Sequence, residues 1–183
     1  MAADELYIYD TRIVRMFPDY AGTVIWFSEP VPYPETGLSD GLVAQLSAWE
    51  ASYYANLDDD FRWRSLTALH RFSSDGLELA RAVAAEIGPE FQVEYHSFED
   101  TDAIALLRGE EPASNSAARD VFAARADRAR ADWAAAQRRL AEVGPETGVV
   151  LLARAGSGAA FYRPAAEGEV PPGGVTLDDG AAR

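Results

Sequence analysis

Short runs of β-branched and aromatic residues open the chain. The runs at 11–17 (TRIVRMF) and 23–28 (TVIWFS) flank a segment at 18–22 (PDYAG) that has the composition of a turn. This pattern predicts a β-hairpin, with residues 6–9 (LYIY) as a further edge strand. The proline-rich segment 29–37 that follows is expected to be an extended connector.

Helical periodicity begins just after residue 38. Ser39 is placed to cap a helix whose apolar positions recur every three or four residues, at Leu42, Leu46, Trp49, Tyr53 and Leu57. Two further helices are predicted, a short one over 61–72 and another over 75–87. The second of these is expected to start at Asp75, because Asp75 and Glu78 have the spacing of a capping box, and a Gly-Pro pair ends it.

The second half of the chain contains one strand, one long helix and a second hairpin. Residues 91–97 (FQVEYHS) alternate as a half-buried strand does, and 97–116 reads as an acidic loop. The long helix at 116–143 has a heptad pattern of apolar positions, namely Phe122, Ala126, Ala129, Trp133, Ala136, Leu140 and Val143. Residues 148–153 and 159–163 are expected to pair as the second hairpin.

This order of elements predicts the fold class. Because strands and helices do not alternate strictly, we expect an α+β fold rather than a doubly wound parallel sheet. The expected architecture is a mixed or antiparallel sheet of about five strands, with helices packed on one face. Residues 1–163 would form a single domain, and residues 164–183 an acidic C-terminal tail rich in proline and glycine.

Composition excludes several chemistries. The sequence contains no cysteine, and all 16 of its basic residues are arginines. Disulfides, thiol nucleophiles, lysine Schiff bases and a P-loop lysine are therefore excluded. The first residues do not resemble a secretion signal, and no segment has the apolar length of a membrane span, so the expected location is the cytoplasm.

Negative charge is concentrated in two parts of the chain. The formal net charge is −14; residues 1–60 contain eleven acidic residues and two arginines, and residues 86–112 contain eight acidic residues and one arginine. Such a field opposes binding to nucleic acids and anionic membranes and favours a basic protein partner. Solubility alone is the simpler explanation of the same charge.

The segment 53–72 (YYANLDDDFRWRSLTALHRF) contains most of the candidate chemistry. Asp58, Asp59 and Asp60 lie between two predicted helices, and carboxylates at the start of the second would interact favourably with its dipole. Trp63 is expected to pack against the aromatic face of the first helix, with the flanking arginines in solvent. The alternative is a pocket for a small polar ligand.

Two other segments contain candidate motifs. The segment HSFEDTD places His96 near Glu99, Asp100 and Asp102, a set of side chains that is chemically suited to a divalent ion. It contains neither an H-E-x-x-H pattern nor a calcium-loop pattern, so a solvated histidine above an acidic loop is preferred. Ser157 in ARAGSGAAF lacks the flanking glycines and the following helix that a nucleophile elbow or a dinucleotide loop requires. We therefore expect no metal and no cofactor.

Two functions remain. The preferred one is a small acidic protein-binding domain, not an enzyme. It would be an inhibitor or immunity-type protein that neutralises a basic partner, such as a nuclease toxin, through carboxylates at Asp58, Asp59, Asp60, Glu99, Asp100 and Asp102. The alternative is a small enzyme or ligand-binding domain with a pocket formed by Arg62, Trp63, Arg64, His70 and His96, in which a histidine is the general base. The 116–143 helix could also form a homodimer.

Overall fold

The structure is a computed structural model that describes residues 12–27, 29–96, 98, 104–143, 150–153 and 159–162. The chain divides into two compact units, and the division falls between Ala131 and Asp132. The first unit contains a sheet and the helices packed on it. The second contains a separate hairpin.

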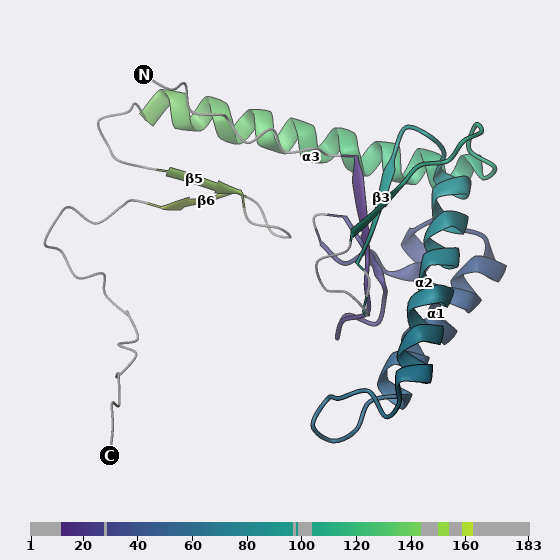
Figure 1. The fold of residues 1–183 in the computed structure, drawn as a ribbon. Helices are drawn as coiled ribbons and strands as arrows, with labels where there is room; N and C mark the ends of the chain where they lie inside the picture. The colour runs from purple at the N-terminus through teal and green to yellow at the C-terminus, as the bar shows by residue number, and fades with distance from the viewer. Residues whose placement is uncertain are drawn as a thin grey trace, which may run out of the picture. The chain divides into compact units, whose positions relative to one another are not determined.

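A mixed four-stranded sheet forms the centre of the first unit (Figure 1). Its strands are β1 (Ile13–Met16), β2 (Ile25–Trp26), β3 (Gln92–His96) and β4 (Ile104–Leu107), in the order β2-β1-β3-β4. β1 pairs antiparallel with β2 and parallel with β3, and β3 pairs antiparallel with β4. The predicted α+β class and mixed sheet are confirmed. The sheet has four strands rather than about five, and residues 6–9 lie outside the described residues.

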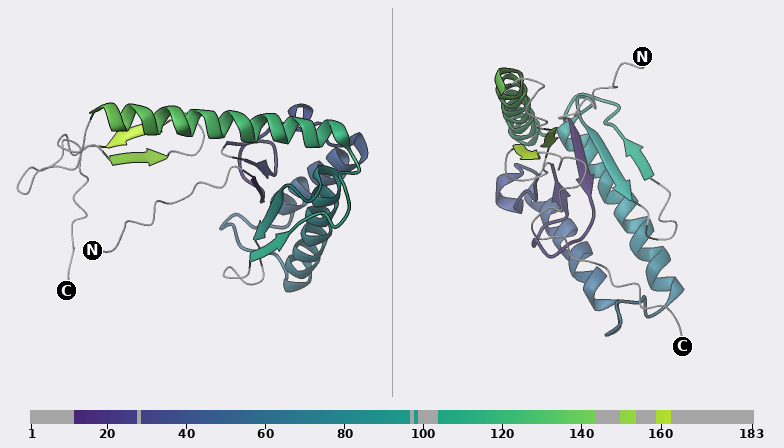
Figure 2. Two further views of the ribbon diagram at one scale, coloured as in Figure 1. Left: turned by 90° about the horizontal axis from the view of Figure 1, so that it is seen from above. Right: turned by 90° about the vertical axis from the view of Figure 1, so that its left-hand side faces the viewer.

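Among the described residues, three α-helices accompany the sheet: α1 (Asp40–Ala55), α2 (Leu66–Ile87) and α3 (Ser116–Val143). α1 and α2 run side by side (Figure 2). The Ser39 side chain caps α1 by accepting a hydrogen bond from the backbone N–H of Leu42, as predicted. The bounds of α3 also agree with the prediction.

α2 corrects the prediction of two helices over 61–72 and 75–87. It is one helix, and its N-cap is Ser65, whose side chain accepts from the Ala68 N–H. Asp75 and Glu78 lie in its interior and cap nothing. The turn-forming sequence Ser-Ser-Asp-Gly stays helical because it packs into the core, where the Tyr95 hydroxyl donates to the Ser73 carbonyl at 3.0 Å.

β4 corrects the prediction of a loop over 97–116. Residues 104–107 pair with β3, and the residues directly opposite each other include Leu107 with Val93 and Leu106 with Glu94. Ile104 and Leu106 are 48% and 59% exposed, so the apolar residues of this edge strand do not mark one buried face. β4 therefore carries little of the period-two signal of a half-buried strand.

The core lies between the sheet and the helices. The Tyr95 ring lies 6.2 Å from that of Trp49 in α1. Phe122 in α3 lies 6.1 Å from Phe91 and 6.3 Å from Phe27, so the first half of α3 packs on the same core. The fully buried core residues with the largest side chains are Phe91, Phe122, Met16, Ile25, Leu46 and Ile87. Packing of this half of α3 within its own chain is thus confirmed, and the homodimer stays a prediction.

The opposite face of the sheet is polar at its centre. Arg15 lies opposite Glu94, and the Arg15 Nε and Glu94 Oε1 atoms are 3.4 Å apart. The same carboxylate oxygen lies 2.8 Å from Nε2 of His96. These three residues alternate with the buried positions of β1 and β3, which places them away from the helices.

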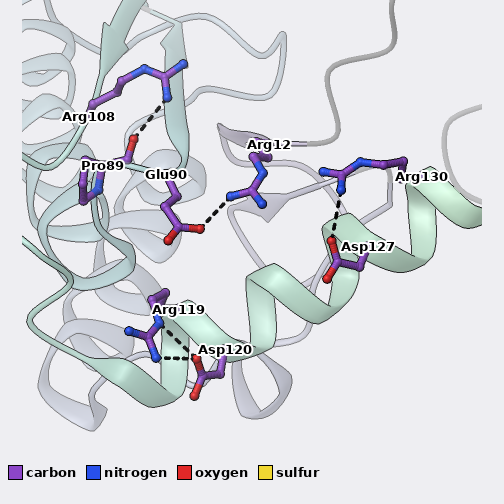
Figure 3. Close-up of polar contacts among 8 residues, drawn as sticks. All are labelled: Arg12, Pro89, Glu90, Arg108, Arg119, Asp120, Asp127 and Arg130. Carbon is purple, nitrogen blue, oxygen red and sulfur yellow. Dashed lines mark hydrogen bonds and ion pairs between the residues drawn. The ribbon is translucent and has the colours of Figure 1, made fainter.

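Polar contacts fasten the segments that flank the sheet (Figure 3). Arg12 pairs with Glu90 at 2.7 Å, and its guanidinium lies 5.5 Å from the centre of the Phe91 ring. Arg108, just after β4, donates to the Pro89 carbonyl at 3.2 Å. The other two ion pairs in Figure 3 lie within α3. Exposed pairs of this kind contribute little stability each, so the stability of the fold depends mainly on its buried core.

A partly buried polar network joins the connector to α1. The Tyr33 hydroxyl donates to Glu50 Oε2 at 3.0 Å and accepts from the Val24 N–H at 3.3 Å. Burial first, and then the Glu50 carboxylate, raise the pKa of Tyr33 well above its ordinary value. The folded protein therefore holds this hydroxyl protonated at a pH where the unfolded chain ionises it.

This network gives the protein a pH-dependent stability at alkaline pH. The contribution is fully present below the unfolded tyrosine pKa of about 10 and is lost as the pH rises from there toward the raised folded pKa. We expect the unfolding free energy of Tyr33→Phe to fall less steeply above about pH 10 than that of the parent protein. Urea unfolding at a series of pH values measures this, and parallel curves for the two proteins would contradict it.

The second unit contains the predicted second hairpin. β5 (Val150–Ala153) pairs antiparallel with β6 (Ala159–Tyr162), which confirms that prediction. The connecting residues 154–158, including Ser157, and the predicted tail over 164–183 lie outside the described residues. In the described part of the chain, no helix combines the length and apolar character needed to cross a membrane.

Candidate functional site

The three aspartates form a tight turn between α1 and α2, at the end of the helix pair where α1 stops (Figure 1). Asp58 Oδ1 accepts from the backbone N–H groups of Asp60 and Arg62, both at 2.9 Å. The Asp58 N–H donates to the Arg62 carbonyl at 2.9 Å, and Leu57 and Trp63 form a β-bridge that closes the turn. The expected dipole interaction is therefore wrong, because α2 begins only at Leu66.

Phe61 lies at the tip of this turn with a left-handed backbone. Its φ is 59°, and its side chain is 69% exposed. Asp59 and Asp60 precede it and are exposed, and Asp60 Oδ2 lies 3.6 Å from the Arg62 guanidinium. The turn thus presents an aromatic ring beside carboxylates.

A cluster of aromatic rings packs against the base of the turn. The centre of the Trp63 ring lies 5.7 Å from the ring centre of Tyr53, 5.1 Å from that of Phe72 and 6.4 Å from that of Phe98. Phe98 is also in contact with Phe72 and Tyr53, at 5.1 and 5.6 Å. The prediction that Trp63 packs against the aromatic face of α1 is confirmed, and the cluster fixes the base of the turn.

Two further aromatic rings are exposed near the end of α1. Tyr20, 82% exposed, and Tyr54, 39% exposed, have ring centres 6.2 Å apart. Asp19 directly precedes Tyr20 in the chain, and burial, followed by the charges of Tyr20 and Asp19, raises the pKa of Tyr53. We call the partly exposed side chain of Asp19 and the exposed side chains of Tyr20, Tyr54, Asp59, Asp60 and Phe61 the α1-end surface.

A groove of about 770 Å³ runs between α1 and α2. Trp49 and Phe72 are among its apolar lining residues, and an ion pair between Arg71 Nε and Asp75 Oδ2, 3.6 Å apart, is part of its wall. Its remaining lining residues are Gln45, Ala48, Ser52, Asn56, Ser65, Thr67, Ala68, Glu78, Leu79 and Ala82. The sequence reading missed this groove, and the one available signal was the recurrence of small and polar residues every three or four positions on α1.

The residues of the alternative pocket are placed on different elements. Arg62 and Arg64 are exposed, as expected, and the Arg64 N–H donates to the Asn56 carbonyl at 2.8 Å. His70 is exposed on α2 and does not line the groove, whereas His96 pairs with Glu94 on the sheet face away from the helices. The structure thus places Arg62, Trp63 and Arg64 between α1 and α2, His70 on α2 and His96 on the other face of the sheet. A catalytic or ligand-binding use of these residues stays a prediction.

The acidic loop after β3 lies outside the described residues. Glu99, Asp100 and Asp102 belong to this segment, so their contact with a partner stays a prediction. Within the part of the chain that the structure covers, no three histidine, aspartate or glutamate side chains are grouped closely enough to hold a metal ion.

The fold and its surface define an α+β protein with exposed aromatic and carboxylate side chains gathered at one end of a helix pair. Residues 12–98 match the model of a family described as Serratia CdiI immunity protein-like. The match is just under half of the chain and contains β1 through β3 with the turn and the groove, but not β4 or α3. It supports an immunity-type protein. No curated protein matches the chain.

Proposed function

We propose that this chain is an immunity-type protein that binds and neutralises a basic protein toxin. The observation that carries the proposal is the family match over residues 12–98. An immunity protein acts by binding, so it needs a recognition surface rather than a catalytic group. The α1-end surface lies wholly within the matched residues and has the aromatic composition that is enriched at protein interfaces.

Charge supports a basic partner. The net charge of −14 favours encounter with a positively charged protein. The proposed contact residues are Asp58, Asp59, Asp60, Glu99, Asp100 and Asp102. Within the turn, the Asp58 carboxylate accepts hydrogen bonds from two backbone N–H groups, whereas Asp59 and Asp60 are exposed. Asp59 and Asp60 are therefore the turn residues proposed to face the partner's arginines and lysines.

Co-purification tests the proposal. The tagged chain is expressed in its native host, captured, and eluted across a salt gradient, and each fraction is identified by mass spectrometry. We expect one basic protein to elute with rising salt, and we expect the purified chain to inhibit the toxic activity of that protein. If the chain elutes alone at every salt concentration, or if the recovered protein is unaffected by it, the proposed function is wrong.

Charge reversal gives a sharper prediction. The double variant Asp59→Arg, Asp60→Arg should slow association with the recovered toxin by about tenfold at low salt, because steering depends on the charge near the contact. The matched control reverses the exposed pair Glu110 and Glu111, which lie outside the family match. Stopped-flow or surface-plasmon association rates measure both. Equal slowing by the two double variants would mean that overall charge, and not this turn, steers the encounter.

A further inference from the structure

We infer that Phe61 is the anchor of the interface: its ring enters an apolar pocket on the basic partner, and Asp59 and Asp60 meet the arginines or lysines at the rim of that pocket. This inference rests on the proposed function and names the residue at its centre. It differs from an electrostatic account, in which the carboxylates alone would hold the partner.

The backbone of Phe61 is the first observation. Among the described residues, Phe61 is the one non-glycine residue with a positive φ, at 59°. A residue with a Cβ is disfavoured in this region, and asparagine, aspartate and glycine occupy it more readily. Strained residues of this kind persist only where the surrounding structure holds them, and they gather at functional sites.

The exposure of the ring is the second observation. Phe61 is 69% exposed, so its ring gains little from burial in the folded chain. Trp63, two residues later, packs against Tyr53 and Phe72 and supplies the apolar contact that the turn needs. A large apolar side chain on a strained backbone, without burial in its own fold, is accounted for by a pocket in another molecule.

The rigidity of the turn is the third observation. The Asp58 carboxylate holds two backbone N–H groups, and the Leu57–Trp63 bridge closes the turn on the aromatic cluster. A side chain presented on a preformed turn loses less conformational freedom on binding than one on a mobile loop. Aromatic residues at the centre of an interface commonly carry most of its binding energy.

The flanking charges select the partner. Asp59 and Asp60 directly precede Phe61 and are exposed. Arg62 pairs with Asp60 at 3.6 Å in an exposed ion pair, which a competing arginine or lysine of the partner can replace. The pocket that fits this surface is therefore apolar inside and basic at its rim.

The test compares two substitutions of exposed apolar residues. Phe61→Asn replaces the ring with a residue that tolerates the left-handed backbone. Leu106→Asn removes an apolar side chain of comparable exposure, 59%, on β4. The probe is the protein recovered by co-purification, expressed separately and purified. We expect Phe61→Asn to raise Kd by about 30-fold or more, mainly through faster dissociation, and Leu106→Asn to leave it nearly unchanged.

A second measurement does not need the partner. If Phe61 serves binding rather than folding, the melting temperature of Phe61→Asn stays at or above that of the parent protein. A clear drop in melting temperature would overturn the inference, because it would give the ring a structural role. Asp58→Ala should weaken binding in the same direction as Phe61→Asn while also lowering the melting temperature, since two backbone hydrogen bonds of the turn are lost.

The possible failures are distinguishable. Tight binding by the parent chain with unchanged binding by Phe61→Asn overturns this inference and leaves the proposed function standing. A loss of binding that occurs only in Leu106→Asn would overturn the inference, because it would place the interface on β4 instead of the turn. If the chain has no partner, the proposed function and this inference fail together.

Discussion

Trp49→Ala is expected to lower the unfolding free energy by about 3–5 kcal/mol. Trp49 is 4% exposed, its ring stacks on that of Phe72 at 4.4 Å, and its indole N–H donates to the Phe72 carbonyl at 2.9 Å. It also meets Tyr95 of β3, so one side chain joins α1, α2 and the sheet. Urea unfolding followed by circular dichroism measures the loss without relying on tryptophan fluorescence.

Trp49→Phe is the matched control for this prediction. It keeps an aromatic ring against Phe72 and removes the indole N–H and part of the volume. We expect it to cost about 1–2 kcal/mol, well below the alanine variant. If both variants cost less than about 1 kcal/mol, Trp49 does not hold α1, α2 and the sheet together as the structure indicates.

Gly76→Ala is expected to destabilise the protein by about 1–3 kcal/mol, although alanine favours a helix more than glycine does. A Cβ at Gly76 would lie 2.5 Å from Cζ2 of Trp49 and 2.6 Å from the Tyr95 hydroxyl oxygen. Both atoms belong to buried side chains, and that hydroxyl donates to the Ser73 carbonyl. α2 must therefore move away from the core to admit a single methyl group.

Gly41→Ala is the control with the opposite sign. Gly41 is also helical, in the first turn of α1, and a Cβ there would meet nothing within 4 Å. We expect it to leave stability unchanged or raise it by up to about 1 kcal/mol, through helix propensity alone. Chemical unfolding of the two variants side by side separates the two effects. Similar changes in the stability of both variants would show that the close approach at Gly76 does not exclude a Cβ there.

The elements that the sequence predicted well are those whose signals are local. Ser39 and the apolar spacing that follows it predict α1, and the alternation of Val93 and Tyr95 predicts β3. The heptad pattern predicts α3, and Ala118, Phe122 and Ala126 are its buried positions in the core of the first unit. In α1, β3 and the first half of α3, a single periodicity matches the buried positions that the structure describes.

The elements that the sequence predicted badly depend on distant contacts. The turn-like sequence around Asp75 stays helical because Gly76 lets α2 approach Trp49 and Tyr95, neither of which is near it in the chain. β4 is an edge strand whose apolar residues are partly exposed, so its pattern resembles that of a loop. Tertiary packing overrode local propensity in the first case, and pairing with β3 supplied the missing signal in the second.

The sequence predicted which residues lie at the candidate site but not the conformation of the turn that holds them. The sequence indicated that the aspartates lie between two helices and that Trp63 packs inward, and both are correct. It could not show that Asp58 binds the backbone of its own turn, because this depends on the conformation that places Phe61 at φ 59°. The groove between α1 and α2 could not be predicted either, since it depends on how two helices pack.

The parallel pairing of β1 with β3 sets the order in which a newly synthesised chain can fold. β1 lies between β2 and β3, yet 75 residues separate its last residue, Met16, from Gln92, the first residue of β3. While the chain leaves the ribosome, the first hairpin can form early, but its inner edge stays unpaired until β3 has emerged. Non-local pairing of this kind is slow and leaves a strand edge open to other chains. A growing chain that stalls between α1 and α2 would thus present an open β1 edge and an unfinished core, which is the state that chaperones bind.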